Sequence, residues 1–129
     1  MNMSFIDNIE DRTKENSNFR KVLYTGTYMQ LVVMSLKPGE DIGLEVHDTV
    51  DQFFRVEEGE GKVVMNGEES VVKEEMVFIV PAGVEHNVVN TSETQDLKLY
   101  TIYAPPNHPN ETVHMTKDDA MAAEEDHHH

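Results

Sequence analysis

The chain is divided into many short stretches of β-forming residues, and this division constrains its fold more than any other feature. Between residues 19 and 103, runs rich in Val, Ile, Phe, Tyr and Leu alternate with turn residues. The runs cover residues 22–24, 28–36, 52–56, 62–65, 70–72, 76–80, 84–89 and 97–103. Short strands separated by regular turn signals are typical of antiparallel sandwiches and barrels. The sequence therefore predicts an all-β fold.

The sharpest turn signal is Asn66-Gly67, which lies between two of these runs. A two-residue hairpin of type I′ needs a positive φ at both central residues, and Asn-Gly meets that requirement at low cost. We therefore expect a tight hairpin that joins the strand ending near Met65 to the strand around Val71.

The two ends of the chain lack the strand pattern. Residues 1–18 are polar, with one or two helical turns expected at 7–12, and we assign the β domain to residues 19–104. Residues 105–126 are assigned to a proline-rich connection followed by a helix, which Thr116 is placed to cap. The last three residues, His127–His129, are interpreted as the remnant of an expression tag.

Charge and cysteine content exclude several classes of function. The 129-residue chain has 10 basic and 25 acidic residues, a formal net charge of −15. Such a charge repels phosphate backbones and anionic lipid surfaces, so we expect neither nucleic-acid nor membrane binding. The absence of cysteine rules out thiolate metal sites and cysteine nucleophiles, and it fits a cytoplasmic protein. No apolar run reaches the length of about 18–20 residues that a membrane span needs.

Side chains of the metal-ligating type occur in two separate blocks. Glu45 and His47 are two residues apart, so they project from one face if the segment is extended. His86 stands between Val84 and Val88 on its own strand face, which places an imidazole among inward apolar residues. A buried imidazole needs polar partners, and a metal ion is one way to supply them.

The spacing of these two blocks resembles that of the cupins. Their first motif is a glycine, five residues, His-x-His, three or four residues, a glutamate, six residues and a glycine. At these positions this chain has Gly39, Glu45, His47, Gln52 and Gly59. The second motif is a glycine, five residues, Pro-x-Gly, two residues, a histidine, three residues and an asparagine. Here the chain has Glu75, Pro81, Gly83, His86 and Asn90.

The resemblance implies a double-stranded β-helix, or jelly-roll, barrel. In this fold a divalent metal would be bound inside the barrel by side chains from both motifs, here Glu45, His47, Gln52 and His86. The flanking sequence is similar to small single-domain cupins of the mannose-6-phosphate isomerase-like group. Cupins of this size usually pair, so the resemblance also implies a homodimer. We expect the stretch Leu31–Met34 to supply an exposed edge for that pairing.

Two of the four implied ligands differ from the cupin pattern, because Glu45 replaces a histidine and Gln52 replaces the glutamate. The two changes offset each other, and the set keeps a single negative charge. Two histidines and one carboxylate suit Mn, Fe, Co, Ni or Zn, and the same composition occurs in non-haem iron centres. Gln52 is then either a weak amide-oxygen ligand or a group that holds a water molecule beside the metal.

These observations lead to three hypotheses about function. The first is Lewis-acid isomerase or lyase chemistry on a small polar carbonyl or sugar-like metabolite, with His108 moving the proton. The second is an iron-dependent dioxygenase, and the third is a non-catalytic cupin that binds a small molecule. Tyr103, His108 and His114 lie in or after the proline segment. They either fold over the barrel mouth or belong to a surface connection.

Overall fold

The computed structural model describes residues 4–127, which form two antiparallel β-sheets and two helices. The helices are α1 (Ile9–Glu15) and α2 (Lys117–His127). The strands are β1 (Arg20–Thr25), β2 (Gln30–Leu36), β3 (Asp51–Glu58), β4 (Glu60–Met65), β5 (Glu68–Lys73), β6 (Val77–Val80), β7 (His86–Asn90), β8 (Leu97–Ala104) and β9 (Val113–His114). The all-β prediction is confirmed. All eight expected strands are present, whereas β9 was not anticipated.

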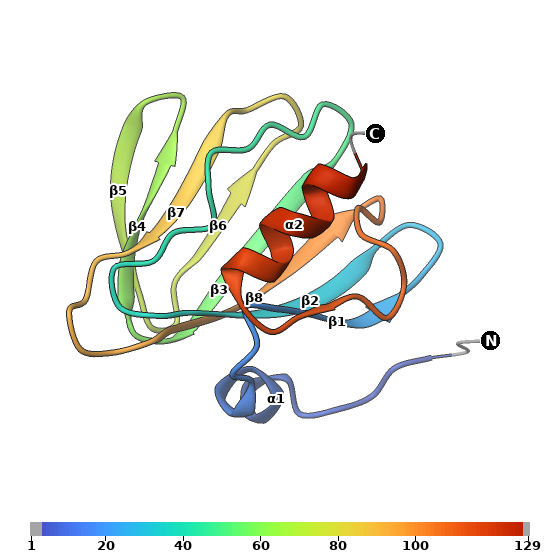
Figure 1. The fold of residues 1–129 in the computed structure, drawn as a ribbon, viewed down its shortest axis with the longest axis horizontal. Coiled ribbons are helices and arrows are strands. Elements are labelled where there is room, and N and C mark those ends of the chain that lie inside the picture. Colours follow the sequence, from blue (N-terminus) through green and yellow to red (C-terminus); the bar gives the residue numbers. More distant parts are fainter. Residues whose placement is uncertain (1–3, 128–129) are drawn as a thin grey trace.

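The strands form a six-stranded sheet in the order β6-β3-β8-β2-β1-β9 and a three-stranded sheet in the order β5-β4-β7. The two sheets lie against each other, with α1 below them and α2 in front of them in the view of Figure 1. The chain changes sheet four times, at the β3–β4, β5–β6, β6–β7 and β7–β8 connections, so the two halves of the sequence interleave. This is the jelly-roll arrangement.

The hairpin expected at Asn66-Gly67 is confirmed. Asn66 has a φ of 48° and Gly67 a φ of 83°, as a type I′ turn requires. Met65 and Glu68 pair directly across the turn, so the loop contains two residues only.

Strand alternation decides which side chains fill the interior. In β8 the buried positions are Leu97, Leu99, Thr101 and Tyr103, and the residues between them are partly exposed. In β3 the same alternation buries Gln52, Phe54 and Val56, whereas β2 is buried on both faces from Val32 to Leu36. The buried apolar side chains form one continuous core.

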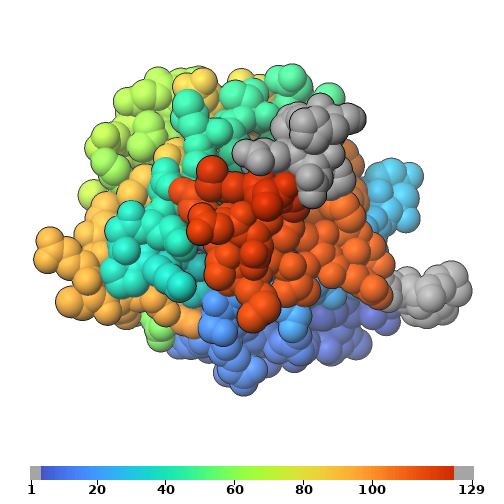
Figure 2. All heavy atoms as spheres, viewed as in Figure 1, coloured from blue at the N-terminus to red at the C-terminus, as the bar shows by residue number. Residues whose placement is uncertain are grey.

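The terminal segments pack onto this barrel. Asn8 caps α1 by accepting from the backbone N–H of Asp11, and Thr116 caps α2 by accepting from that of Asp119. Lys117 donates to the Asp41 carboxylate, which ties the start of α2 to the 39–50 segment. Figure 2 shows the C-terminal segment covering one face of the molecule beside that segment. No helix within residues 4–127 is long and apolar enough to cross a membrane.

The position of Leu31–Met34 differs from our expectation. These residues lie in β2, which pairs with β1 on one side and β8 on the other, so they offer no free strand edge. Val32, Val33 and Met34 are fully buried. The stretch is apolar because it belongs to the core, and the homodimer stays a prediction that this stretch does not support. Residues 128–129 of the presumed tag lie outside the described residues.

Candidate metal centre

Three side chains of the metal-ligating type converge inside the barrel: Glu45, His47 and His86. One ligand atom from each lies within 4.8 Å of the others. Glu45 and His86 form an isolated antiparallel bridge, with both backbone N–H···O distances at 2.9 Å. Residues that face each other in such a bridge point their side chains to the same side. The bridge therefore brings the carboxylate of the first block onto the imidazole of the second.

The orientation of His86 is fixed by its backbone neighbour. Its Nδ1 lies 2.9 Å from the carbonyl oxygen of Val84. A carbonyl can only accept, so Nδ1 carries the proton and Nε2 of the neutral ring keeps its lone pair. Nε2 is buried and has no hydrogen-bond partner among the described residues. Metal-ligating histidines commonly bind a carbonyl through the other ring nitrogen, which fixes the tautomer in the same way.

His47 completes the group from the same extended segment as Glu45. Its Nε2 lies 3.9 Å from a carboxylate oxygen of Glu45, and its ring centroid lies 5.5 Å from that of His86. The side chains of His47 and Glu45 are 14% and 18% exposed, so the centre is not completely closed off from solvent. The backbone is held by the Gly83 N–H, which donates to the carbonyl of His47 at 2.8 Å.

Gln52 lies on the inner face of β3, directly opposite Tyr103 of β8. Its Nε2 donates to the Thr101 hydroxyl at 3.0 Å, which fixes the amide. Its Oε1 is buried without a hydrogen-bond partner among the described residues. A buried amide oxygen without a partner costs free energy unless a ligand or water satisfies it. This acceptor and Nε2 of His86 are two buried polar atoms that a polar ligand or a water molecule would satisfy.

Tyr103 and His108 form a hydrogen-bonded pair next to this centre. The Tyr103 ring packs edge-on against His47, with centroids 5.9 Å apart, and its hydroxyl lies 3.2 Å from Nε2 of His108. The pKa of Tyr103 is raised to about 12, mainly by burial; the charge on Arg20 opposes this rise and the charge on Glu45 adds to it. The phenol is therefore neutral at pH 7 and able to donate. The structure places His108 against Tyr103, outside the group formed by Glu45, His47 and His86.

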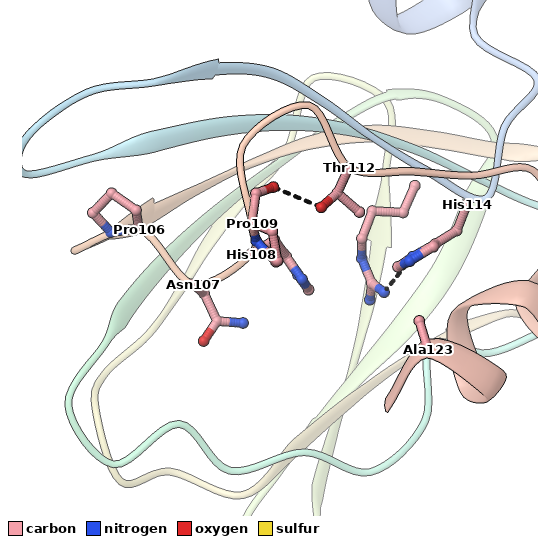
Figure 3. A pocket seen from close by; sticks show the side chains of 8 residues that line it. Pro106, Asn107, His108, Pro109, Thr112, His114 and Ala123 are labelled. Carbon is pink, nitrogen blue, oxygen red and sulfur yellow. Dashed lines mark hydrogen bonds between the residues drawn. The ribbon is translucent and has the colours of Figure 1, made fainter. Parts of the chain in front are cut away.

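Sequence reasoning did not identify Arg20 as a functional residue. Arg20 is only 2% exposed and lines a cavity beneath the C-terminal segment with His108 and His114 (Figure 3). The sequence did contain a signal for this residue: Arg20 precedes the buried Val22 by two positions, so both side chains lie on the inward face of the strand. A charged residue at such a position requires a functional or structural explanation.

The donor set fits a divalent transition metal. Two imidazoles and one carboxylate are supplied from within the barrel, and imidazole with carboxylate oxygen suits Mn, Fe, Co, Ni or Zn. Gln52 offers an amide oxygen on the same inner face of the barrel. Because three strong donors converge among the described residues, a metal bound here would have open positions for a small molecule.

Comparison with known proteins agrees with this architecture. The cupin domain model matches residues 32–103, which include both motif blocks. The uncharacterized protein YrkC of Bacillus subtilis is 52% identical over 127 residues, covering 94% of this chain and 68% of YrkC.

Two solved structures extend the comparison. The crystal structure of BH2720 from Bacillus halodurans superposes with a TM-score of 0.89 at 51% identity, covering 92% of this chain and 93% of that one. A predicted oxalate decarboxylase from Thermotoga maritima gives a TM-score of 0.57 at 26% identity, covering 60% of this chain and 66% of that one. With a family model that spans more than half of its length and relatives this similar, the chain belongs to the cupin family.

Proposed function

We propose that this protein is a metal-dependent cupin that performs isomerase or lyase chemistry on a small polar carbonyl or sugar-like metabolite. The observation that carries the proposal is the convergence of Glu45, His47 and His86 to within 4.8 Å inside the barrel. These three residues would hold the metal. The bound metal would supply a Lewis acid that polarises a carbonyl or hydroxyl oxygen of the substrate.

The protein's own groups then have distinct roles. The carbonyl of Val84 holds the His86 ring so that Nε2 faces the centre. The Oε1 of Gln52 accepts a hydrogen bond from a substrate hydroxyl or a water molecule. The neutral Tyr103 hydroxyl donates to developing negative charge on the substrate. His108 exchanges a proton with that hydroxyl through Nε2, across the 3.2 Å separation.

The comparisons support the chemical class without naming the substrate. The Thermotoga maritima protein is named as a predicted oxalate decarboxylase, and decarboxylation is a lyase reaction. Membership of the mannose-6-phosphate isomerase-like group remains our proposal from the flanking sequence. An iron-dependent dioxygenase is the second candidate, because two histidines and one carboxylate form the donor set of non-haem iron oxygenases.

Metal content tests the first part of the proposal. The chain should be prepared ending at Asp126, because three consecutive terminal histidines bind metals themselves. We expect about one divalent metal per chain by elemental analysis, and Glu45→Gln should lose it. Glu85→Gln, an exposed carboxylate next to His86, is the matched control and should retain it. Equal metal content in both variants would overturn the assignment.

Turnover tests the second part. The loaded protein should be screened against sugar phosphates, keto acids and β-dicarbonyl compounds, with and without oxygen. Conversion under anaerobic conditions supports isomerase or lyase chemistry, whereas conversion that consumes oxygen and requires iron(II) supports the dioxygenase. A loaded protein that binds these compounds without converting any of them would be the non-catalytic cupin.

A further inference from the structure

The connection that leaves β8 carries His108, which exchanges a proton in the proposed function. It covers residues 105–109 and runs from the end of β8 towards the turn before β9 (Figure 3). Three of its five residues are prolines, which have no backbone N–H, so only Asn107 and His108 can donate from the main chain. Most of the connection is exposed, and only Pro106 and His108 are half-buried. Side-chain packing therefore does little to fix the position of His108.

The side-chain amide of Gln30 binds both of these N–H groups. Its Oε1 accepts from the backbone N–H of Asn107 at 3.1 Å and from that of His108 at 3.0 Å. Its Nε2 donates to the carbonyl oxygen of His108 at 2.7 Å and to the Thr25 hydroxyl at 3.0 Å. Backbone N–H groups only donate and carbonyls only accept, so this pattern fixes which end of the amide is the oxygen. Gln30 thus holds the main chain of His108 at both its N–H and its carbonyl.

Gln30 lies beside Tyr103 inside the barrel. It is the first residue of β2, it is fully buried, and it pairs directly with Tyr103 of β8. Residues directly opposite each other in an antiparallel pair point their side chains to the same side, so the two share the inner face. The residue that holds the His108 backbone is therefore the neighbour of the hydroxyl that lies 3.2 Å from His108 Nε2.

The connection does not depend on Gln30 to satisfy its backbone groups. Asn107 is exposed, and backbone groups at such a place can bond to water instead. An apolar residue at position 30 would add to the core, as Leu36 does at the other end of the same strand. Exchanging hydrogen bonds with water changes stability only modestly, so what the amide supplies is a fixed location for the main chain.

We propose that Gln30 is a positioning residue, which holds the main chain of His108 so that the His108 ring stays on the Tyr103 hydroxyl. The two rings pack edge-on with their centroids 5.0 Å apart, an arrangement that requires the connection to approach Tyr103 in one way. This assignment rests on the proposed function, in which the pair moves the proton. Gln30 acts through His108 and is not one of the three converging metal-ligating side chains.

Nuclear magnetic resonance of the histidine rings tests the positioning without a substrate. The metal-free chain ending at Asp126 is labelled at histidine nitrogen and studied at mildly alkaline pH, where a histidine ring is neutral. The His108 signals are identified by their loss in His108→Gln, and the ring that bonds to Tyr103 should favour one tautomer. Gln30→Met keeps an unbranched side chain and removes the amide. The His108 ring signals should then shift towards those of an exposed histidine with both tautomers present, and unchanged signals would overturn the proposal.

Three comparisons separate positioning from a general loss of structure. The His86 ring is held by the Val84 carbonyl, so its signals should stay unchanged in Gln30→Met. Thr25→Val removes one hydrogen bond of Gln30 and leaves the three to the connection, so it should leave the His108 signals unchanged. Gln30→Glu keeps the acceptor and loses the donor, so it should cause a smaller shift of the same kind, and it serves if Gln30→Met does not fold. Shifts of His108 as large in Thr25→Val as in Gln30→Met would overturn the proposal.

Turnover by the metal-loaded protein tests what the positioning does. With a substrate found in the screen, Gln30→Met should lower kcat by about 10–100-fold with little change in KM, since a displacement of about 1 Å costs that much. It should add nothing to the loss in His108→Gln, because it acts through His108. Additive losses would overturn the proposal. A wild type without metal or turnover would contradict the proposed function, whereas the resonance experiment would still decide whether Gln30 positions His108.

Discussion

The two ends of the barrel interior are built from the same strands but carry opposite chemistry. At one end, the inner positions are Leu36 of β2, Val56 of β3 and Leu97 and Leu99 of β8, all of them fully buried. At the other end, the same inner faces carry Gln30, Gln52 and Tyr103, which lie side by side in register across the three strands. Strand alternation places both sets inward, so periodicity alone does not distinguish a core from a site.

This contrast distinguishes the residues that stabilise the fold from those of the candidate site. The apolar end contributes burial, which stabilises by about 25 cal/mol per Å² of apolar surface removed from water. The polar end holds Gln52 Oε1 and His86 Nε2 without hydrogen-bond partners among the described residues, and such groups lower stability. Natural proteins retain unsatisfied groups of this kind mainly at functional sites.

The largest expected effect is on stability, at the apolar end. Leu99→Ala should lower the free energy of unfolding by about 2–5 kcal/mol, because it removes a fully buried side chain and leaves a cavity. Ile79→Ala, at a position 58% exposed on β6, is the control and should change it by less than about 0.5 kcal/mol. Urea denaturation measures both. Similar losses in the two variants would contradict the position of the core.

Substitution of a candidate ligand at the polar end should lower the affinity for metal. His86→Ala should weaken metal binding by more than about 100-fold, since changes to groups behind the ligands already cost about 10–100-fold. His108→Ala should change it only a few-fold, because His108 contacts Tyr103 and lies outside the three converging side chains. Competition with a chelator measures both affinities on the chain ending at Asp126. A comparable loss in the two variants would place the metal elsewhere.

The burial of Tyr103 should make the stability of the protein depend on pH in the alkaline range. Its pKa is raised to about 12 in the folded state, against about 10 in an unfolded chain. Between these values the unfolded chain loses a proton that the folded chain keeps, so stability falls as pH rises, by about 3 kcal/mol in total. Tyr103→Phe should remove this part of the pH dependence. Spectroscopic titration should show one tyrosine that ionises near pH 12, and its ionisation near pH 10 would contradict the burial.

The smallest effect concerns the hydrogen bond between Gln52 and Thr101. The double variant Gln52→Leu/Thr101→Val replaces both partners by apolar groups and should change the free energy of unfolding by less than about 1 kcal/mol. The same variant should weaken metal or substrate binding, because the acceptor Oε1 is lost. Thermal denaturation and metal titration together check this separation. A large loss of stability without a change in binding would assign Gln52 a purely structural role.

Local patterns predicted the fold well because strand alternation and turn chemistry act over a few residues. The hairpin at Asn66-Gly67 and the N-cap at Thr116 follow from such local rules. β9 escaped prediction because two residues carry no periodicity and acquire their structure only by pairing with β1. The apolar stretch Leu31–Met34 was assigned to an edge because composition does not distinguish an exposed strand from a central one.

The site could be predicted only in part. The spacing of the two blocks, read through the cupin resemblance, indicated that Glu45, His47 and His86 would meet, and the structure brings them together. The cavity around Arg20 could not be predicted, because it depends on how the C-terminal segment folds back onto β1. Residues that are 94 positions apart in sequence meet there, and no local pattern encodes that contact.

The most direct test of the metal centre is anomalous diffraction from crystals of the chain ending at Asp126, loaded with zinc or manganese. The account predicts one strong anomalous peak inside the barrel, bonded to Nε2 of His86, an imidazole nitrogen of His47 and a carboxylate oxygen of Glu45. A peak bonded to other side chains, or a fully loaded crystal with no peak between these three residues, would contradict it.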